Sequence, residues 1–77
     1  MSEEERIKEI LVEQLKIDES ILNRDLNFDS LAIDSLELLE LIVAIEEEFD
    51  IFLDDQEMRR LETLGEMSDY ILEKIKE

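Results

Sequence analysis

The scarcity of chain-breaking residues is the feature that most restricts the fold of this sequence. Its 77 residues contain a single glycine, Gly65, and no proline. Because strand-and-turn architectures depend on these residues at their turns, the composition favours a bundle of helices. Hydrophobic residues make up 44% of the chain, which is enough for one small core. We therefore expect one all-α domain spanning residues 1–77.

Helix start signals divide the chain into four helical segments. Four pairs of residues have the spacing of a capping box, in which an N-cap side chain and an acid three residues later bond each other's backbone: Ser2 with Glu5, Asp34 with Glu37, Asp54 with Glu57, and Thr63 with Glu66. With the hydrophobic periodicity, they predict main helices over 3–16 and 34–49, a short third helix over 54–61 and a last main helix from 63. Residues 17–33 are rich in Asp, Asn and Ser, which predicts a long first loop with one helical turn near 19–22. The expected fold is a small four-helix bundle.

The charge balance restricts the partners. Eight basic and twenty-four acidic residues give a net charge of −16, which repels nucleic acid and anionic lipid and attracts proteins with Lys and Arg patches. The first residues lack the basic start and apolar run of a secretory signal, and no apolar run reaches membrane-spanning length. We expect a soluble, cytoplasmic monomer with no nucleic acid partner and no stable membrane association.

The residues that most catalytic sites require are absent. Without histidine or cysteine, a serine nucleophile lacks its usual base and no thiolate is available. The lysines fall on predicted polar helix faces, and the carboxylates lie on solvated surfaces that do not suit them to acid–base work. The acidic loop lacks the glycine and the ligand spacing of an EF-hand. The sequence therefore predicts neither an enzyme nor a metal-binding protein.

The second predicted main helix is more apolar than one buried face requires. Its residues 36–45 are apolar at eight positions of ten. One stripe suits a core position and comprises Leu38, Leu41 or Ile42, Ile45 and Phe49. Leu36, Leu39 and Val43 form a second stripe, which is either buried against another side of a central helix or exposed as a docking surface. No Lys or Arg lies between Arg24 and Arg59, and this unrelieved acidity favours a binding role.

Several motifs together resemble a known family. Asp34-Ser35-Leu36 opens the apolar, acidic helix, and Glu46-Glu47-Glu48-Phe49-Asp50 follows near its end. With Glu13-Gln14-Leu15 and Asp69-Tyr70-Ile71, the sequence resembles the acyl carrier proteins of fatty acid and polyketide synthesis, in particular the discrete ones, over nearly its whole length. The resemblance implies that Ser35 accepts a 4′-phosphopantetheine arm from coenzyme A through a separate transferase, and that Asp34 and Leu36 complete the motif. Acyl groups would then travel on the arm as thioesters.

The local sequence favours Ser35 as the attachment residue independently of the resemblance. If Asp34 is the N-cap, Ser35 is the first helical residue, and its hydroxyl points outward beside backbone N–H groups without helical partners. The positive end of the helix dipole favours an anion such as a phosphodiester there. Ser30 lies in a second Asp-Ser-Leu tripeptide, but no long helix follows it, so we expect loop structure there with an Asx-type turn at Asp29.

The resemblance also implies partners and a place for the cargo. Basic-patch enzymes of acyl chain synthesis or transfer, and the transferase, would contact the positions Leu36, Glu37, Leu39, Glu40, Val43 and Glu46. A folded-back acyl chain would lie against Ile42, Ile45, Leu61, Leu64 and Ile71.

Some positions depart from the family pattern. Ala32 replaces a usual glycine; it stiffens the approach to Ser35 if that backbone is helical or extended, and is strained if φ is positive. Asp54 replaces a common proline, and Arg59-Arg60 is an unusual basic pair. Two other functions stay open: an aminoacyl or D-alanyl carrier, and an unmodified acidic helical adaptor for a basic protein partner.

Overall fold

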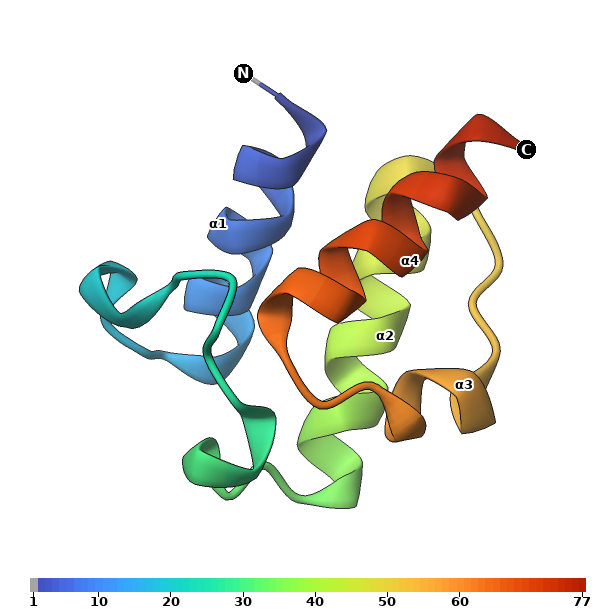
Figure 1. Cartoon of the computed structure of the whole chain (residues 1–77). Helices are drawn as coiled ribbons and strands as arrows, with labels where there is room; N and C mark the ends of the chain where they lie inside the picture. The colour runs from blue at the N-terminus through green and yellow to red at the C-terminus, as the bar shows by residue number, and fades with distance from the viewer. Residues whose placement is uncertain (1) are drawn as a thin grey trace.

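Four helices and two short 3₁₀ turns make up the fold (Figure 1). The computed structural model describes residues 2–77. Within these residues the elements are α1 (Glu3–Leu15), η1 (Glu19–Ile21), η2 (Phe28–Leu31), α2 (Ser35–Phe49), α3 (Asp55–Arg60) and α4 (Leu64–Lys76). The all-α fold with three main helices, one short helix and a long first connection is confirmed. The start of α1 and the end of α4 lie at one end of the molecule, and α2 begins at the opposite end (Figure 1).

Local capping explains where the helices begin. Complete capping boxes start α1, α2 and α4 at Ser2, Asp34 and Thr63. In α3, Asp54 instead accepts hydrogen bonds from the N–H groups of two following residues, without a reciprocal acid. α2, α3 and α4 each begin one residue later than predicted, because their N-caps lie outside the helices. α3 also ends one residue earlier, and Lys16 ends α1 one residue earlier in a left-handed conformation with φ 56°.

The core lies between α1, α2 and α4. Ile7 and Leu11 of α1 meet Ile42 and Ile45 of α2, with Ile71 of α4 closing the cluster, and all five are at most 1% exposed. Along the predicted core stripe of α2, Leu41, Ile42 and Ile45 are buried, whereas the two end positions are half-buried. Burying these aliphatic side chains supplies the main favourable term for a chain whose net charge opposes compaction.

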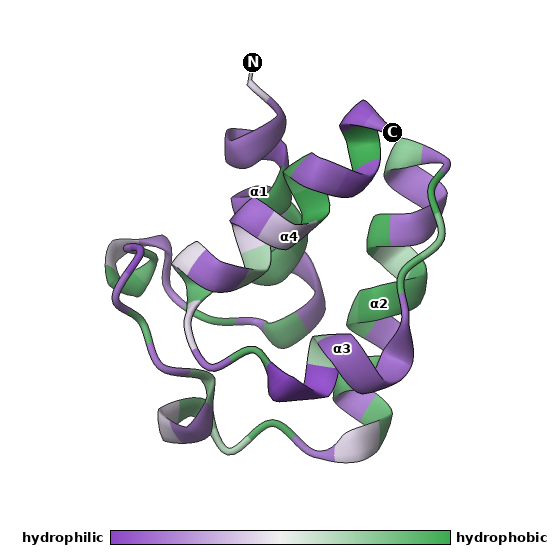
Figure 2. Cartoon of the chain, turned by 45° about the vertical axis from the view of Figure 1, so that its right-hand side comes forward, coloured by the Kyte–Doolittle hydropathy of each residue, from purple (hydrophilic) through white to green (hydrophobic). Residues whose placement is uncertain are grey.

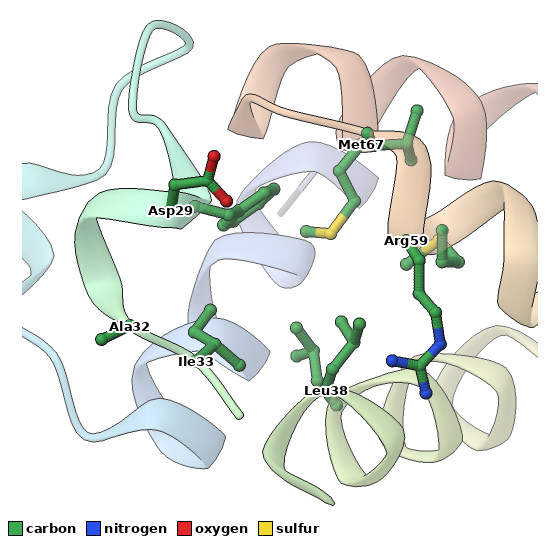
Figure 3. Close-up of a pocket in the computed structure, with 10 residues that line it drawn as sticks. Asp29, Ala32, Ile33, Leu38, Arg59 and Met67 are labelled. Carbon is green, nitrogen blue, oxygen red and sulfur yellow. The ribbon is translucent and has the colours of Figure 1, made fainter. Parts of the chain in front are cut away.

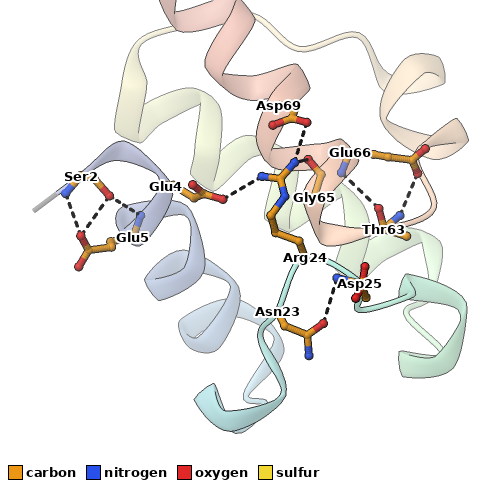
Figure 4. Close-up of polar contacts among 10 residues, drawn as sticks. All are labelled: Ser2, Glu4, Glu5, Asn23, Arg24, Asp25, Thr63, Gly65, Glu66 and Asp69. Carbon is orange, nitrogen blue, oxygen red and sulfur yellow. Dashed lines mark hydrogen bonds and ion pairs between the residues drawn. The ribbon is translucent and has the colours of Figure 1, made fainter.

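Arg24 fastens the long first connection to two helices (Figure 4). Its guanidinium donates to Glu4 of α1 at 3.2 Å and to Asp69 of α4 at 2.8 Å. The backbone N–H of Gly65 donates to the Arg24 carbonyl at 3.0 Å, and a Cβ at Gly65 would lie 3.0 Å from that same oxygen. The only glycine of the chain is therefore where the connection approaches α4 more closely than a Cβ ordinarily allows.

The first connection holds more structure than its sequence predicts. The turn expected near 19–22 is present as η1, but η2 was not predicted. The Asx-type turn expected at Asp29 is wrong, because it is the Asn27 side chain that accepts from the Asp29 N–H at 2.8 Å. Ser30 lies within η2, and its hydroxyl donates to the Asn27 carbonyl at 2.6 Å. An isolated bridge between Asn27 and Thr63 ties this segment to the start of α4, which a local pattern cannot reveal.

Candidate functional site

Ser35 is the first residue of α2 and is exposed. The Asp34 carboxylate accepts from the Glu37 N–H at 2.8 Å, and the Glu37 carboxylate accepts from the Asp34 N–H at 3.2 Å. This box leaves the N–H groups of Ser35 and Leu36 without a protein acceptor in the described part of the chain. An anion attached to the Ser35 hydroxyl would meet free donors and the positive end of a helix of 15 residues.

The backbone before Ser35 turns sharply at Ala32. This residue ends η2 with φ 52° and ψ 43°, the left-handed region that favours glycine. Ala32 therefore has the positive φ that strains an alanine, rather than a helical or extended conformation. The turn redirects the chain from η2 into the N-cap at Asp34.

The second apolar stripe of α2 faces outward. Leu36, Leu39 and Val43 are 64%, 43% and 41% exposed, so the bundle does not absorb them. Figure 2 shows α2 coloured as hydrophobic over much of its length and interrupted by acidic positions. The question that the sequence left open is thereby answered: the stripe is a surface. We call Leu36, Leu39 and Val43 the outer stripe.

Acidic residues border the outer stripe, and few of them form ion pairs with basic side chains. Glu37 and Glu40 are exposed. Among residues 2–77, the only acid of α2 within ion-pair distance of a basic side chain is Glu48, at 2.9 Å from Arg6. The hydrogen bond from Arg6 lowers the pKa of Glu48. The Arg6 contact secures α1 to the far end of α2, and the end near Ser35 keeps its uncompensated negative charge.

Glu46 differs from the other positions expected to meet partners. Its side chain is half-buried, and its carboxylate accepts from the backbone N–H of Leu53 at 2.8 Å. Its backbone carbonyl also accepts from the N–H of Ile51 at 3.2 Å. Glu46 therefore holds the turn after α2, a role that its place in an acidic run did not indicate.

A cavity opens beside the start of α2 (Figure 3). It has a volume of about 290 Å³ and lies between η2, α2, α3 and the start of α4. Its lining comprises Phe28, Asp29, Ala32, Ile33, Leu38, Leu41, Met58, Arg59, Leu61 and Met67. Three of these, Asp29, Ala32 and Arg59, are exposed and therefore mark the opening. Ala32 lies three residues before Ser35, so the opening adjoins the serine along the chain.

The cavity differs from the acyl-contacting set expected from the sequence. Of that set only Leu61 lines it, whereas Ile42, Ile45, Leu64 and Ile71 are fully buried in the packed core. The space arises instead where η2 and α3 meet α2 without filling the gap. The inward positions of Leu38 and Leu41 in the helical periodicity were the local signal of this lining.

Within residues 2–77, no three potential ligand side chains gather as a metal ion would require. No helix among these residues combines the length and the apolar content needed to cross a membrane.

Comparisons with known proteins agree with this geometry. The family model described as a phosphopantetheine attachment site matches residues 5–71. The crystal structure of an acyl carrier protein from Thermotoga maritima has the same fold, with a TM-score of 0.77 and 22% identity, over 94% of this chain and 85% of that chain. Domains of this family carry covalent 4′-phosphopantetheine and are carriers rather than catalysts. The chain therefore belongs to the family of phosphopantetheine attachment domains, and it has the fold of an acyl carrier protein.

Proposed function

We propose that Ser35 is the residue to which the 4′-phosphopantetheine arm is attached. The observation that carries this proposal is an exposed hydroxyl on the first residue of a long helix whose neighbouring N–H groups are free. The second Asp-Ser-Leu tripeptide offers no such position, because the Ser30 hydroxyl donates to a backbone carbonyl inside a four-residue turn. The thiol at the tip of the attached arm supplies the thioester chemistry that this cysteine-free chain lacks.

The cargo that fits this site is an acyl group. The cavity that opens at Ala32, three residues before Ser35, is lined mainly by aliphatic, Phe and Met side chains. A water molecule occupies about 30 Å³ in the liquid, so a cavity of about 290 Å³ holds on the order of ten non-hydrogen atoms. Sheltering a short or medium acyl chain there removes apolar surface from water. This supports carriage of acyl intermediates in fatty acid, polyketide or related lipid biosynthesis.

The outer stripe and its acidic border suit enzymes that present basic patches, including a phosphopantetheinyl transferase. Leu36, Leu39 and Val43 offer apolar contact, and Glu37 and Glu40 offer charge to Lys and Arg on the partner. Added salt should weaken this association, because exposed charges are screened over about 8 Å at physiological ionic strength. The same net charge of −16 opposes self-association and supports a monomer.

The attachment residue is tested by intact mass. The protein is incubated with coenzyme A, Mg²⁺ and a phosphopantetheinyl transferase, together with Ser35→Ala and the matched control Ser30→Ala. We expect one phosphopantetheine-sized mass gain in the wild type and in Ser30→Ala, and none in Ser35→Ala. A mass gain in Ser35→Ala would overturn the assignment.

A second function is favoured by one observation, the exposure of the outer stripe, which does not depend on Ser35. An unmodified adaptor would use this surface to bind a basic protein. The adaptor hypothesis predicts no mass gain with any transferase.

An aminoacyl carrier, in contrast, would be modified but would be loaded by aminoacyl-activating rather than acyl-activating enzymes. Offering both kinds of enzyme to the modified protein separates the two cargoes.

A further inference from the structure

The four arginines of this chain form two pairs with different surroundings. Arg6 and Arg24 each form ion pairs at 3.3 Å or less with two or more carboxylates. Arg59 and Arg60, the last two residues of α3, are both exposed. Within residues 2–77, the only carboxylate in ion-pair range of either is that of Asp55, at 3.8 Å from Arg59. The fold therefore uses the first pair to join its helices and leaves the positive charge of the second pair at the surface.

Ser35 lies between the outer stripe and the last turn of α3. Leu38 and Leu39 follow the serine by three and four residues, so all three lie on the same side of α2. Leu39 belongs to the outer stripe, whereas Leu38 lines the cavity together with Arg59. Figure 3 shows the Arg59 side chain extending from α3 toward α2, with its guanidinium on the side of Leu38. A protein surface that reaches Ser35 therefore faces the last turn of α3 as well as the outer stripe.

The opposite edge of the outer stripe is acidic. Glu40 and Glu47 of α2 border an open groove with Leu39, Val43 and Gln14 of α1. Both acids are exposed, and neither forms an ion pair within residues 2–77. Figure 1 shows α1 and α3 on either side of α2. The outer stripe thus runs between an acidic edge next to α1 and a basic turn at the end of α3.

We propose that the acidic edge, the outer stripe and the last turn of α3 form one docking surface with charges of both signs. It fits enzymes that present basic side chains to Glu40 and Glu47 and acidic side chains to the last turn of α3. This inference rests on the proposed function and adds the chemistry of the partner. An enzyme whose whole contact face is basic would place like charges against Arg59 and Arg60, which disfavours the complex. The arginine pair thereby selects among enzymes that use carriers of this fold.

A role confined to α3 predicts something different. Asp55 and Glu57 lie near the start of α3, so the positive charge is restricted to its last turn, where the helix dipole favours a cation. The exposed pair of Asp55 with Arg59 contributes little. Both effects act on the stability of α3, and neither changes the salt-dependent rate of reaction with a partner enzyme.

The test uses a phosphopantetheinyl transferase whose carrier-binding face has basic but no acidic residues, and variants of it in which each of these basic residues is changed to Glu in turn. The carriers are the wild type, Arg59→Gln with Arg60→Gln, and the control Lys8→Gln with Lys76→Gln. The control removes the same two charges from residues that line neither the groove nor the cavity. Circular dichroism verifies that each carrier is folded. The initial rate of mass gain with coenzyme A and Mg²⁺ gives kcat/KM at low and at high salt.

With the unaltered transferase at low salt, kcat/KM should be about fivefold higher for the α3 double variant than for the control double variant, because the like charges are gone. High salt should abolish this difference. For at least one Glu variant of the transferase the order should reverse, with the α3 double variant about fivefold slower than the control.

Equal kcat/KM for the two double variants with the unaltered transferase would overturn the proposal, as would a set of Glu variants in which none reverses the order. A loss of stability in the α3 double variant with unchanged kinetics would assign the arginines to the end of α3 alone. The proposed function fails separately, since no transferase would then add mass to the wild type.

Discussion

The two faces of α2 have nearly the same apolar residue types, but one face is buried and the other is exposed. Its inner face places Leu41, Ile42 and Ile45 in the core, where each is at most 1% exposed. Its outer stripe presents leucine and valine to solvent along the same helix. Aliphatic side chains on one face stabilise the fold, while those on the other are available for contact with a partner. The comparison shows that hydrophobicity within a single helix can serve stability and recognition separately.

The largest expected effect comes from the inner face. Ile45→Ala should lower the free energy of unfolding by about 3 kcal/mol, because it removes a fully buried side chain and leaves a cavity. Urea unfolding followed by circular dichroism measures this loss. Val43→Ala, on the outer stripe, is the matched control and should cost less than about 1 kcal/mol. Similar losses in the two variants would remove the distinction between the faces.

The next effect concerns recognition. Leu39→Ala on the outer stripe should weaken binding to a phosphopantetheinyl transferase about tenfold, or about 1.4 kcal/mol, because apolar contact with the partner is lost. Isothermal titration at low salt measures the affinity. The unfolding free energy should change little. A variant that binds normally would show that the exposed stripe does not contact this enzyme.

A smaller effect is expected at the start of α2, where both faces begin. Asp34→Ala removes the acceptor of the Glu37 N–H and should lower the unfolding free energy by about 1 kcal/mol. Asp34→Asn, which retains an oxygen acceptor, is the control and should lose less. If the unfolding free energy falls equally in the two variants, the charge of Asp34 matters more than its capping oxygen.

The smallest effect tests the turn that leads into α2. Ala32→Gly relieves a left-handed conformation that costs about 1–2 kcal/mol in a non-glycine residue, but it also loosens the unfolded chain by about 0.5–1 kcal/mol. We expect a net gain in unfolding free energy of about 0.5 kcal/mol by urea denaturation. A loss of stability would show that the alanine side chain, which lines the cavity, makes contacts that outweigh its strain.

The features of this protein that could be predicted are those that depend on interactions between residues at most four positions apart. The capping boxes at Ser2, Asp34 and Thr63 are local, and they placed α1, α2 and α4 to within about a residue. The turn η2 was missed because its local bonds to Asn27 gave no sustained helical period, and the bond from the Phe28 N–H to the Glu62 carbonyl that ties it to the fold is long-range. The residues expected to contact a folded-back acyl chain stay a prediction, and the lining of the cavity was not foreseen because it brings together residues of η2, α2, α3 and α4.

The amino-acid sequence by itself determined the helices, the acidic and apolar character of α2 and the position of Ser35 at a helix start, because propensity, periodicity and capping act over short separations. Only the tertiary structure decided that the outer stripe is exposed, that Glu46 bonds Leu53, and that Arg59 stands at the cavity opening. Burial depends on which elements pack together, and α3 and the first connection reach α2 through contacts that no local pattern encodes.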